Sequence, residues 1–438
     1  MSTLIEIGTW KSEVGSTSSV PSIDEKDPEE HQVSPDGGLH AWVCVLGAFF
    51  CQISSFGFIS ACGIFQTHYE LVLLKDYSSS SIAWITTTQI FFIYVLGGVI
   101  GILVDAFGPR KIIIPSSLIS VLGLLMLSMS TKYWEVLLSQ GVVYGIGAAG
   151  LFLPGIVTTG QWFTTNRGLA MGLVASGSSV GGVIFPFMIT ELINRHGFPT
   201  AVRWTALLLA IILSIACICV SPPFPPKGFV ERKSGGFQAF KSVSWIGYTV
   251  GCFFVFWGLF TPFDYLPLMA LKAGFSNNLA RYSIAITNAA SIIGRILPAF
   301  ISDHVGEFNT MCAVAMASGL SILGLWLPLE EHNNHPGILA FGAIFGFASG
   351  GFISLLIPCI VRLSNGQMED LGARTGAFLV VMGVAALTGL PIQGAIFDKN
   401  PDTFVGLIVF AGVMMTFGGC IIVGVRIRRG GISITTKV

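Results

Sequence analysis

Charge is the scarcest feature of this 438-residue sequence. Only 11% of the residues are Asp, Glu, Lys or Arg, against about a quarter in an average soluble domain, while 53% are hydrophobic. So few charges cannot cover a water-exposed surface, which excludes an ordinary soluble protein. The 23 basic residues equal the 23 acidic residues in number, so no net charge favours binding to nucleic acid or to an acidic partner.

Several functional signatures are also missing. The sequence has no Gly-x4-Gly-Lys-Ser/Thr phosphate loop, so nucleotide-driven transport lacks its machinery. No nucleophile, base or metal ligands converge within the apolar segments, and we therefore expect neither an enzyme nor a cofactor. The nine cysteines show no paired spacing, which predicts no disulfide. His332 and His335 have metal-like spacing, but we interpret them as part of a polar outer turn and predict no metal site.

Long apolar runs are what the sequence has in abundance. Twelve of them approach or exceed the ~20 residues that cross hydrocarbon, and many of the 53 glycines lie inside them, where small residues let helices pack closely. These runs predict an all-α membrane protein with twelve transmembrane helices in two pseudo-symmetric six-helix bundles. The predicted spans are 40–66, 81–104, 112–131, 135–160, 169–194, 203–222, 242–265, 278–302, 310–329, 337–361, 373–396 and 404–425.

Polar segments divide the chain. Residues 1–35 are rich in Ser, Glu and Asp and lack a basic start before an apolar run, which predicts a disordered cytosolic tail without a cleavable signal. We assign residues 36–222 to the first bundle and residues 242–425 to the second. The prolines, glycines and basic residues of 223–241 predict a cytosolic linker, and 426–438 a cytosolic tail. Lys and Arg are more numerous on the side of both termini, which is why we place that side in the cytosol.

A short motif occurs once in each half of the chain. Its copies comprise Gly101, Asp105, Gly108, Arg110 and Lys111 after the second span, and Ala299, Asp303 and Gly306 after the eighth. Asp105 can accept hydrogen bonds from helix-end amides or from a basic partner, while Arg110 and Lys111 hold the loop in the cytosol. We interpret the motif as a gate latch, the alternative being an ordinary charged turn. Such internal repeats accompany alternating-access transporters.

This motif resembles the loop signature of the major facilitator superfamily, between its second and third helices. Two further stretches resemble signatures of the monocarboxylate transporter family, and a third looks like its fungal branch. They are PDGGLHAW at 35–42, WFTTNRGLAMG at 162–172 and GIFQT at 63–67. The resemblance extends from Pro35 to Arg426 and implies secondary transport by alternating access. Within it, Asp36 and Trp42 are expected to serve as a helix cap and an interfacial anchor.

Arg295 is the one basic residue deep in a predicted span, where a permanent charge is costly unless it faces a partner or a watery cavity. Asn288 and Ser291 share its helical face, so we predict an anion-binding surface there. Alternatively, Arg295 snorkels to the interface or braces Asp303. The resemblance favours substrate contact, because the family's eighth helix carries a substrate-linked arginine at the matching position. Animal members place an acidic residue at position 291 and a lysine at position 60, where this chain has serines, so proton-coupled lactate transport by that charge set is not expected.

Two further groups are candidates. In the first span Gln52, Ser55, Cys62 and Gln66 are predicted to share one face, where they line a central cavity or make hydrogen bonds between helices. Asp264, near the outer end of the seventh span, is a candidate proton relay, the alternative being a solvated carboxylate.

These observations predict a secondary active transporter of a small organic acid, monocarboxylate-like, or of a related metabolite. Proton coupling is left open. An efflux transporter of a secondary metabolite is the alternative, because four aromatic residues of the seventh span either make an apolar cavity or face lipid: Phe253, Phe254, Phe256 and Trp257. A non-transporting nutrient receptor is less consistent with so short a C-terminal tail. The expected partners are the substrate and the lipid bilayer, in the plasma membrane or else a vacuolar or other internal membrane.

Overall fold

The computed structural model describes residues 36–226, 228, 242–332, 335–364, 371–400, 402–433 and 436–437. The predicted tail 1–35 and residues 229–241 of the predicted linker lie outside the described residues. The described segments form twelve helical spans that are long and apolar enough to cross a membrane. The predicted all-α membrane fold with twelve spans is therefore confirmed.

The first six spans come from the first half of the chain. They are built from α1 (Leu39–Gln52), η1 (Ile53–Gly57), α2 (Cys62–His68), η2 (Tyr69–Leu73), α3 (Ser79–Val95), α4 (Gly97–Phe107), α5 (Arg110–Leu127), α6 (Tyr133–Val136), η3 (Leu137–Tyr144), α7 (Gly145–Trp162), α8 (Arg167–His196) and α9 (Phe198–Cys219), where η marks a π-helical segment.

The other six spans come from the second half. They are built from α11 (Val243–Leu259), α12 (Thr261–Lys272), α13 (Asn277–Val305), α14 (Glu307–Ser321), η5 (Ile322–Trp326), α15 (Leu327–His332), α16 (His335–Leu363), α17 (Leu371–Lys399) and α18 (Val405–Gly430).

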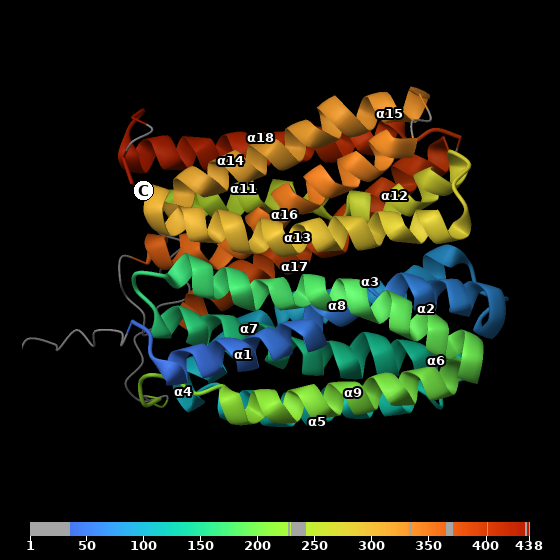
Figure 1. Ribbon diagram of the computed structural model, residues 1–438, viewed down its shortest axis with the longest axis horizontal. Helices are drawn as coiled ribbons and strands as arrows, with labels where there is room; N and C mark the ends of the chain where they lie inside the picture. The colour runs from blue at the N-terminus through green and yellow to red at the C-terminus, as the bar shows by residue number, and fades with distance from the viewer. Residues whose placement is uncertain are drawn as a thin grey trace, which may run out of the picture. The chain divides into compact units, whose positions relative to one another are not determined.

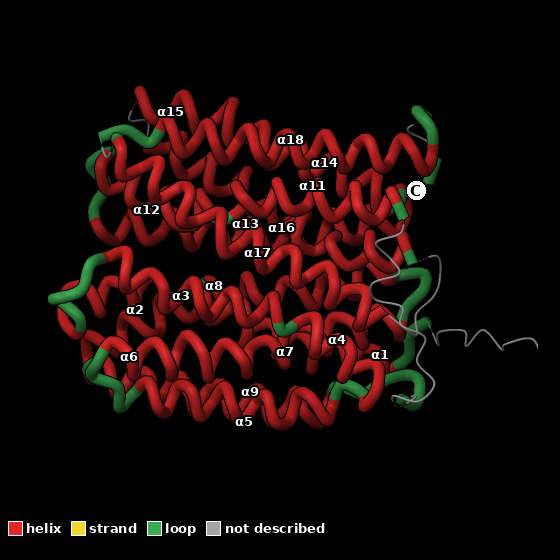
Figure 2. The backbone as a smooth tube through the Cα atoms, turned by 180° about the vertical axis from the view of Figure 1, so that it is seen from behind, coloured by secondary structure: helices red, strands yellow, loops and turns green. Residues whose placement is uncertain are grey.

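The helices of each half lie together, and the most extensive contacts between the halves are those of α17 with α3 and α4 and of α13 with α8 (Figures 1 and 2). We call the contact of α3 and α4 with α17 the first seam, and the contact of α8 with α13 the second seam. The end of the helices that carries the start of α1, the α4–α5 loop and the end of α18 is named the inner end, after the prediction that it faces the cytosol (Figure 1). The opposite end is the outer end.

The first span differs from its prediction. It runs from Leu39 to Leu73 and is interrupted, because the π-helical turn η1 is followed by a tight turn at Ser60 and Ala61 before α2 begins. A π-helical turn adds a residue to the helical repeat. The spacing argument that put Gln52, Ser55, Cys62 and Gln66 on one face assumed an unbroken α-helix, and the structure has an interrupted one there.

The seventh span is longer than predicted and runs from Val243 to Lys272 instead of ending near residue 265. Pro262 does not stop it, because this proline lies in the first turn of α12, where its missing N–H is not needed. Asp264 consequently lies in the first turn of α12, about two helical turns before the span ends at Lys272, rather than at the outer end of a span.

Candidate functional site

The first latch lies at the inner end of the first seam. The carboxylate of Asp105, at the end of α4, accepts hydrogen bonds from the backbone N–H groups of Gly372 (3.1 Å) and Ala373 (2.9 Å) at the start of α17. The first amides of a helix have no partner within the helix and carry partial positive charge, so a carboxylate is a favourable cap. A side chain of the first half thereby holds a helix of the second half.

The second latch mirrors the first. The carboxylate of Asp303, at the end of α13, accepts hydrogen bonds from the N–H groups of Gly168 (2.7 Å) and Leu169 (2.9 Å) at the start of α8. Here the carboxylate belongs to the second half and the capped helix to the first. The two halves are thus joined at the inner end by a reciprocal pair of contacts between helix-end amides and the two aspartates of the repeated motif.

Glycines of the motif are needed for two separate reasons. Gly108 and Gly306, which follow the latch aspartates, have φ of +84° and +111°, a left-handed region that favours glycine. Gly101 permits close approach instead, since a Cβ there would lie 2.0 Å from the carbonyl oxygen of Gly372. In the second seam the matching close contact is made by Gly168 of α8, which lies against Ala299 of α13.

The basic residues of the motif act within the first half. The guanidinium of Arg110 donates to the carbonyls of Val220 (2.6 Å) and Ile218 (2.7 Å) at the end of α9. The ammonium of Lys111 lies 5.9 Å from the ring centroid of Phe107. Arg110 therefore fixes α5 against α9, which supports the α4–α5 turn that follows Asp105.

Asp36 does not cap the first helix, and the cap that we expected is wrong. The N-cap position is Gly38, while the Asp36 carboxylate accepts hydrogen bonds from the N–H groups of Thr164 (2.7 Å) and Thr165 (2.8 Å) and from the Thr165 hydroxyl. Burial raises the pKa of Asp36, but these hydrogen bonds outweigh it and hold the pKa below its usual range. Two signature stretches that are far apart in sequence thus contact each other.

Arg295 lies in the middle of the second seam and is 8% exposed. Its guanidinium donates to the carbonyl of Ala175 (2.6 Å) and to the hydroxyl of Ser178, both on α8, and to Oγ of Ser291 (3.3 Å) on its own helix. It neither snorkels to the interface nor makes a hydrogen bond to Asp303. The arginine instead bridges the two halves.

Of the other two predicted residues on this face of α13, Ser291 contacts Arg295, whereas Asn288 lies about two helical turns away along α13. Ser291 accepts a hydrogen bond from Oγ of Ser179 at 3.2 Å. A Cβ built on Gly182 would lie 2.7 Å from Oδ1 of Asn288 and 2.9 Å from Oγ of Ser60. The interruption of the first span, α8 and α13 therefore meet at one polar point.

Sequence reasoning missed the serines of α8 that face Arg295. The available signal was the run Ser176, Ser178 and Ser179 inside an apolar span, which places hydroxyls on more than one helical face. Their relation to Arg295 was not visible, because the interacting positions 178 and 295 lie 117 residues apart.

An aromatic cluster also joins the two halves. The ring of Tyr94 in α3 lies 5.3 Å from Phe56 and 6.2 Å from Phe152 in the first half, and 5.6 Å from Phe256 in the second. The boundary between the halves therefore contains apolar ring surface as well as the buried cation of the second seam.

Only one of the aromatic residues proposed for the cavity is part of this cluster. Phe256 contacts Tyr94, whereas the rings of Phe254 and Trp257 lie against Phe417 and Phe410 of α18.

The polar residues of the first span are engaged in helix packing. The amide of Gln52 donates to the carbonyl of Phe152 (2.9 Å), and the hydroxyl of Ser55 to the carbonyl of Gln52 (3.4 Å). The amide of Gln66 donates to the Glu70 carboxylate at 3.1 Å. These contacts favour the alternative of hydrogen bonds within and between helices over cavity lining.

Asp264 is not brought together with Arg295. Its side chain is exposed on α12, and within the described ranges nothing makes a hydrogen bond to its carboxylate. The side chains of His332 and His335 lie outside the described residues, and nearby Glu330 accepts hydrogen bonds from Thr403 and Phe404.

Comparison with known proteins identifies relatives over nearly the whole chain. The model of the Major Facilitator Superfamily matches residues 44–367. The MFS-type transporter hasB of Aspergillus fumigatus is 46% identical over 93% of either chain, and the Fujikurins efflux protein of Gibberella fujikuroi is 42% identical over 90% of this chain and 83% of that one. The solved structure of the proton:xylose symporter XylE covers 91% of this chain and 97% of its own, with a TM-score of 0.68 at 14% identity, which shows a shared fold.

Proposed function

Because the chain belongs to the major facilitator superfamily, we propose that it is a secondary transporter that exports an acidic, mainly apolar metabolite by alternating access of its two halves. The relative from Gibberella fujikuroi is named as an efflux protein, and it aligns with most of this chain. Export of a secondary metabolite is therefore better supported than transport of a small monocarboxylate-like acid, which the sequence favoured without a direction. We also propose that the chain belongs to the fungal branch of the monocarboxylate transporter family.

The observation that carries the proposal is the position of Arg295. A guanidinium taken out of water is costly unless its charge is balanced. Within the part of the chain that the structure describes, Arg295 donates only to neutral oxygens and forms no ion pair. An anionic group of the substrate would supply the missing charge, and the planar guanidinium suits a carboxylate bound through both oxygens.

An aromatic cluster between the halves supports an apolar body for that substrate. Tyr94, Phe56, Phe152 and Phe256 contact one another across the boundary, and such ring surface favours an apolar or aromatic ligand. This chain has serines at positions 60 and 291, where the resemblance implies a lysine and an acidic residue in animal members. The site therefore lacks the pair of charges expected for small acids. Asn288, Ser291 and Ser60 then provide neutral hydrogen bonds that orient the substrate.

The latches provide the inner gate of the cycle. When both aspartates cap helices of the opposite half, the inner end is closed, and the site opens inward only after both contacts break. In this proposal the inner end, both termini and the linker face the cytosol, and the chain lies in the plasma membrane or an internal membrane. Asp264 is the candidate carboxylate for proton coupling.

Direction of transport is the test of this proposal. Cells that express the chain are loaded with a panel of acids, ranging from short monocarboxylates to large aromatic acids, and efflux and uptake of each are measured at matched surface expression. We expect efflux of one or more large acids above the level of cells carrying the empty vector. Uptake of short monocarboxylates, without efflux of any larger acid, would contradict export and restore the small-acid function.

A further inference from the structure

Arg426 organises the chain that follows α18. Its guanidinium, 6% exposed, donates to Oδ1 of Asn309 on α14 (2.6 Å) and to the backbone carbonyls of Gly431 (2.6 Å), Ser433 and Thr436 (3.4 Å). A cation is also favoured here by the partial negative charge at the end of α18. One side chain therefore turns the segment after α18 back across the inner end of the second half.

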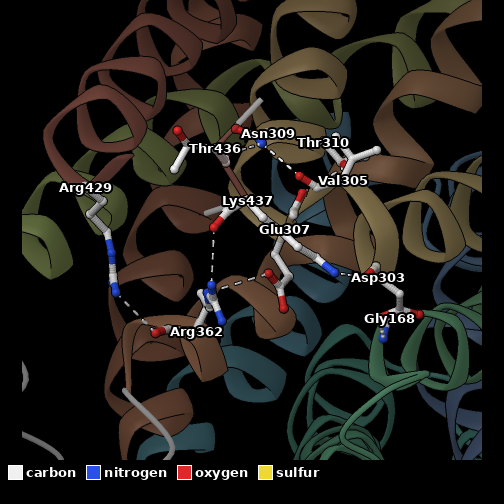
Figure 3. A network of polar contacts seen from close by, with 11 residues as sticks. Gly168, Asp303, Val305, Glu307, Asn309, Thr310, Arg362, Arg429, Thr436 and Lys437 are labelled. Atoms are coloured by element: carbon white, nitrogen blue, oxygen red, sulfur yellow. Dashed lines mark hydrogen bonds and ion pairs between the residues drawn. The ribbon is translucent and has the colours of Figure 1, made fainter. Parts of the chain in front are cut away.

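This segment reaches the loop that carries the second latch (Figure 3). The amide of Asn309 donates to the carbonyl of Thr436 at 2.9 Å. The ammonium of Lys437 donates to the backbone carbonyl of Asp303 at 2.6 Å, and the guanidinium of Arg362 donates to the carbonyl of Lys437 at 3.4 Å. Gly431 to Lys437, so far as the structure describes them, are called the C-terminal strap.

Asp303 is therefore held from two sides. Its backbone carbonyl accepts from Lys437 of the strap, and its carboxylate accepts from Gly168 and Leu169 of the other half. Figure 3 shows Lys437, Asp303 and Gly168 in this order. A contact that fixes the backbone of the α13–α14 loop also fixes the direction of the carboxylate.

The first half contains an equivalent arrangement. After α9 the chain turns back along the inner end, where Arg110 donates to the carbonyl of Val220 and Trp162 Nε1 donates to that of Ser221 at 2.8 Å. The N–H of Gly228 then donates to the carbonyl of Ala106, the residue after Asp105, at 3.1 Å. In both halves, the segment after the sixth span is thus bonded to the backbone of the latch loop.

We propose that these two segments position the latch carboxylates, and that Lys437 and Arg426 are positioning residues of the inner gate. Without the contact from Lys437, the α13–α14 loop keeps more freedom, and Asp303 caps α8 in a smaller fraction of molecules. Because both latches must break for the inner end to open, loosening one favours opening of the other. The inference is independent of the substrate and of the direction of transport.

Hydrogen exchange of the purified full-length protein tests this inference without any ligand. Lys437→Met removes the contact, and Arg428→Met is the matched control, because Arg428 is an exposed cation for which the described structure shows no partner. For Lys437→Met we expect about fivefold faster exchange at Gly168 and Leu169, the factor that one net hydrogen bond contributes, and faster exchange at Gly372 and Ala373 as well. Arg428→Met should exchange like the parent protein.

Two results would overturn the proposal. Unchanged exchange at Gly168 and Leu169 would show that the strap does not position Asp303, and faster exchange there without any change at Gly372 and Ala373 would show a local contact that does not act on the gate. A chain shortened after Gly431 provides a second variant, and it should reproduce the effect of Lys437→Met. Unchanged exchange in the outer-end loops verifies that each variant is folded.

Discussion

The first and second seams make the same kind of contact at the inner end but differ along the rest of their length. At the inner end of each, an aspartate of one half caps a helix of the other. Further along the first seam the contacts are apolar, since a Cβ on Gly97 or Gly98 would meet side-chain carbons of Leu379 or Val380. The equivalent stretch of the second seam contains buried Arg295 and the serines that surround it.

This difference separates gating from recognition. A gate that opens only when both latches break works best with two equivalent latches, and the repeated motif keeps them equivalent. A substrate without twofold symmetry needs no such repetition, so one seam can pack through glycines while the other carries the charge. In the proposed mechanism the first seam is mainly a packing contact, and the second is both a packing contact and the binding surface.

The largest effect is expected from filling the first seam. Gly101→Ala places a methyl group where the carbonyl oxygen of Gly372 lies 2.0 Å away, so α4 and α17 must separate and the Asp105 latch cannot close. We expect transport to fall by at least about tenfold at equal surface expression. Gly324→Ala is the control, because a Cβ there meets nothing within 4 Å and should be tolerated. Normal transport by Gly101→Ala would show that the seam tolerates separation.

A smaller effect is expected from neutralising either latch. Asp105→Asn and Asp303→Asn each keep an oxygen acceptor but lose the charge that favours a helix N-terminus, a difference worth about 1 kcal/mol. We expect each variant to cycle several times more slowly with nearly unchanged substrate affinity, to a similar extent in the two. Binding and flux are measured separately once a substrate is known. A large loss of affinity at normal turnover would contradict the assignment of these residues to the gate.

The smallest effect concerns Asp36, which joins two stretches of the first half outside either seam. Its pKa is lowered in the folded protein, so its hydrogen bonds stabilise fully above the unfolded pKa of about 4 and are lost as the pH falls further. We expect Asp36→Asn to lower the melting temperature by about 1 °C at pH 7, since the site is exposed and screened. The difference should shrink below pH 4, and Asp76→Asn, an exposed control, should show neither effect. A difference that is constant with pH would rule out a role for the charge.

The features that the sequence could predict are those carried by local patterns. Twelve apolar runs gave twelve spans, and the repeated motif placed Asp105 and Asp303 at corresponding loops. The position of Arg295 in an apolar run was enough to identify it as unusual, because charge in hydrocarbon is rare.

Features that depend on distant partners could not be predicted. The amides that Asp105 binds lie 267 and 268 residues away in the chain, and those of Asp36 lie 128 and 129 residues away. No proline marks the interruption at Ser60 and Ala61, so the sequence did not show that helical spacing could not be carried across it to Gln66. The sequence also did not show that the seventh span continues past Pro262, which lies in the first turn of α12, where a proline is compatible with a helix.

The central claim is that the second seam recognises an acid through Arg295. The most direct measurement is transport of an acid and of its methyl ester by Arg295→Lys and Arg295→Gln at matched surface expression. If the planar guanidinium binds a carboxylate, the lysine variant should retain part of the preference for the acid and the glutamine variant should lose it, because lysine keeps the charge but not the paired donors. An unchanged preference for the acid in both variants would contradict the claim and leave Arg295 as a structural bridge between α13 and α8.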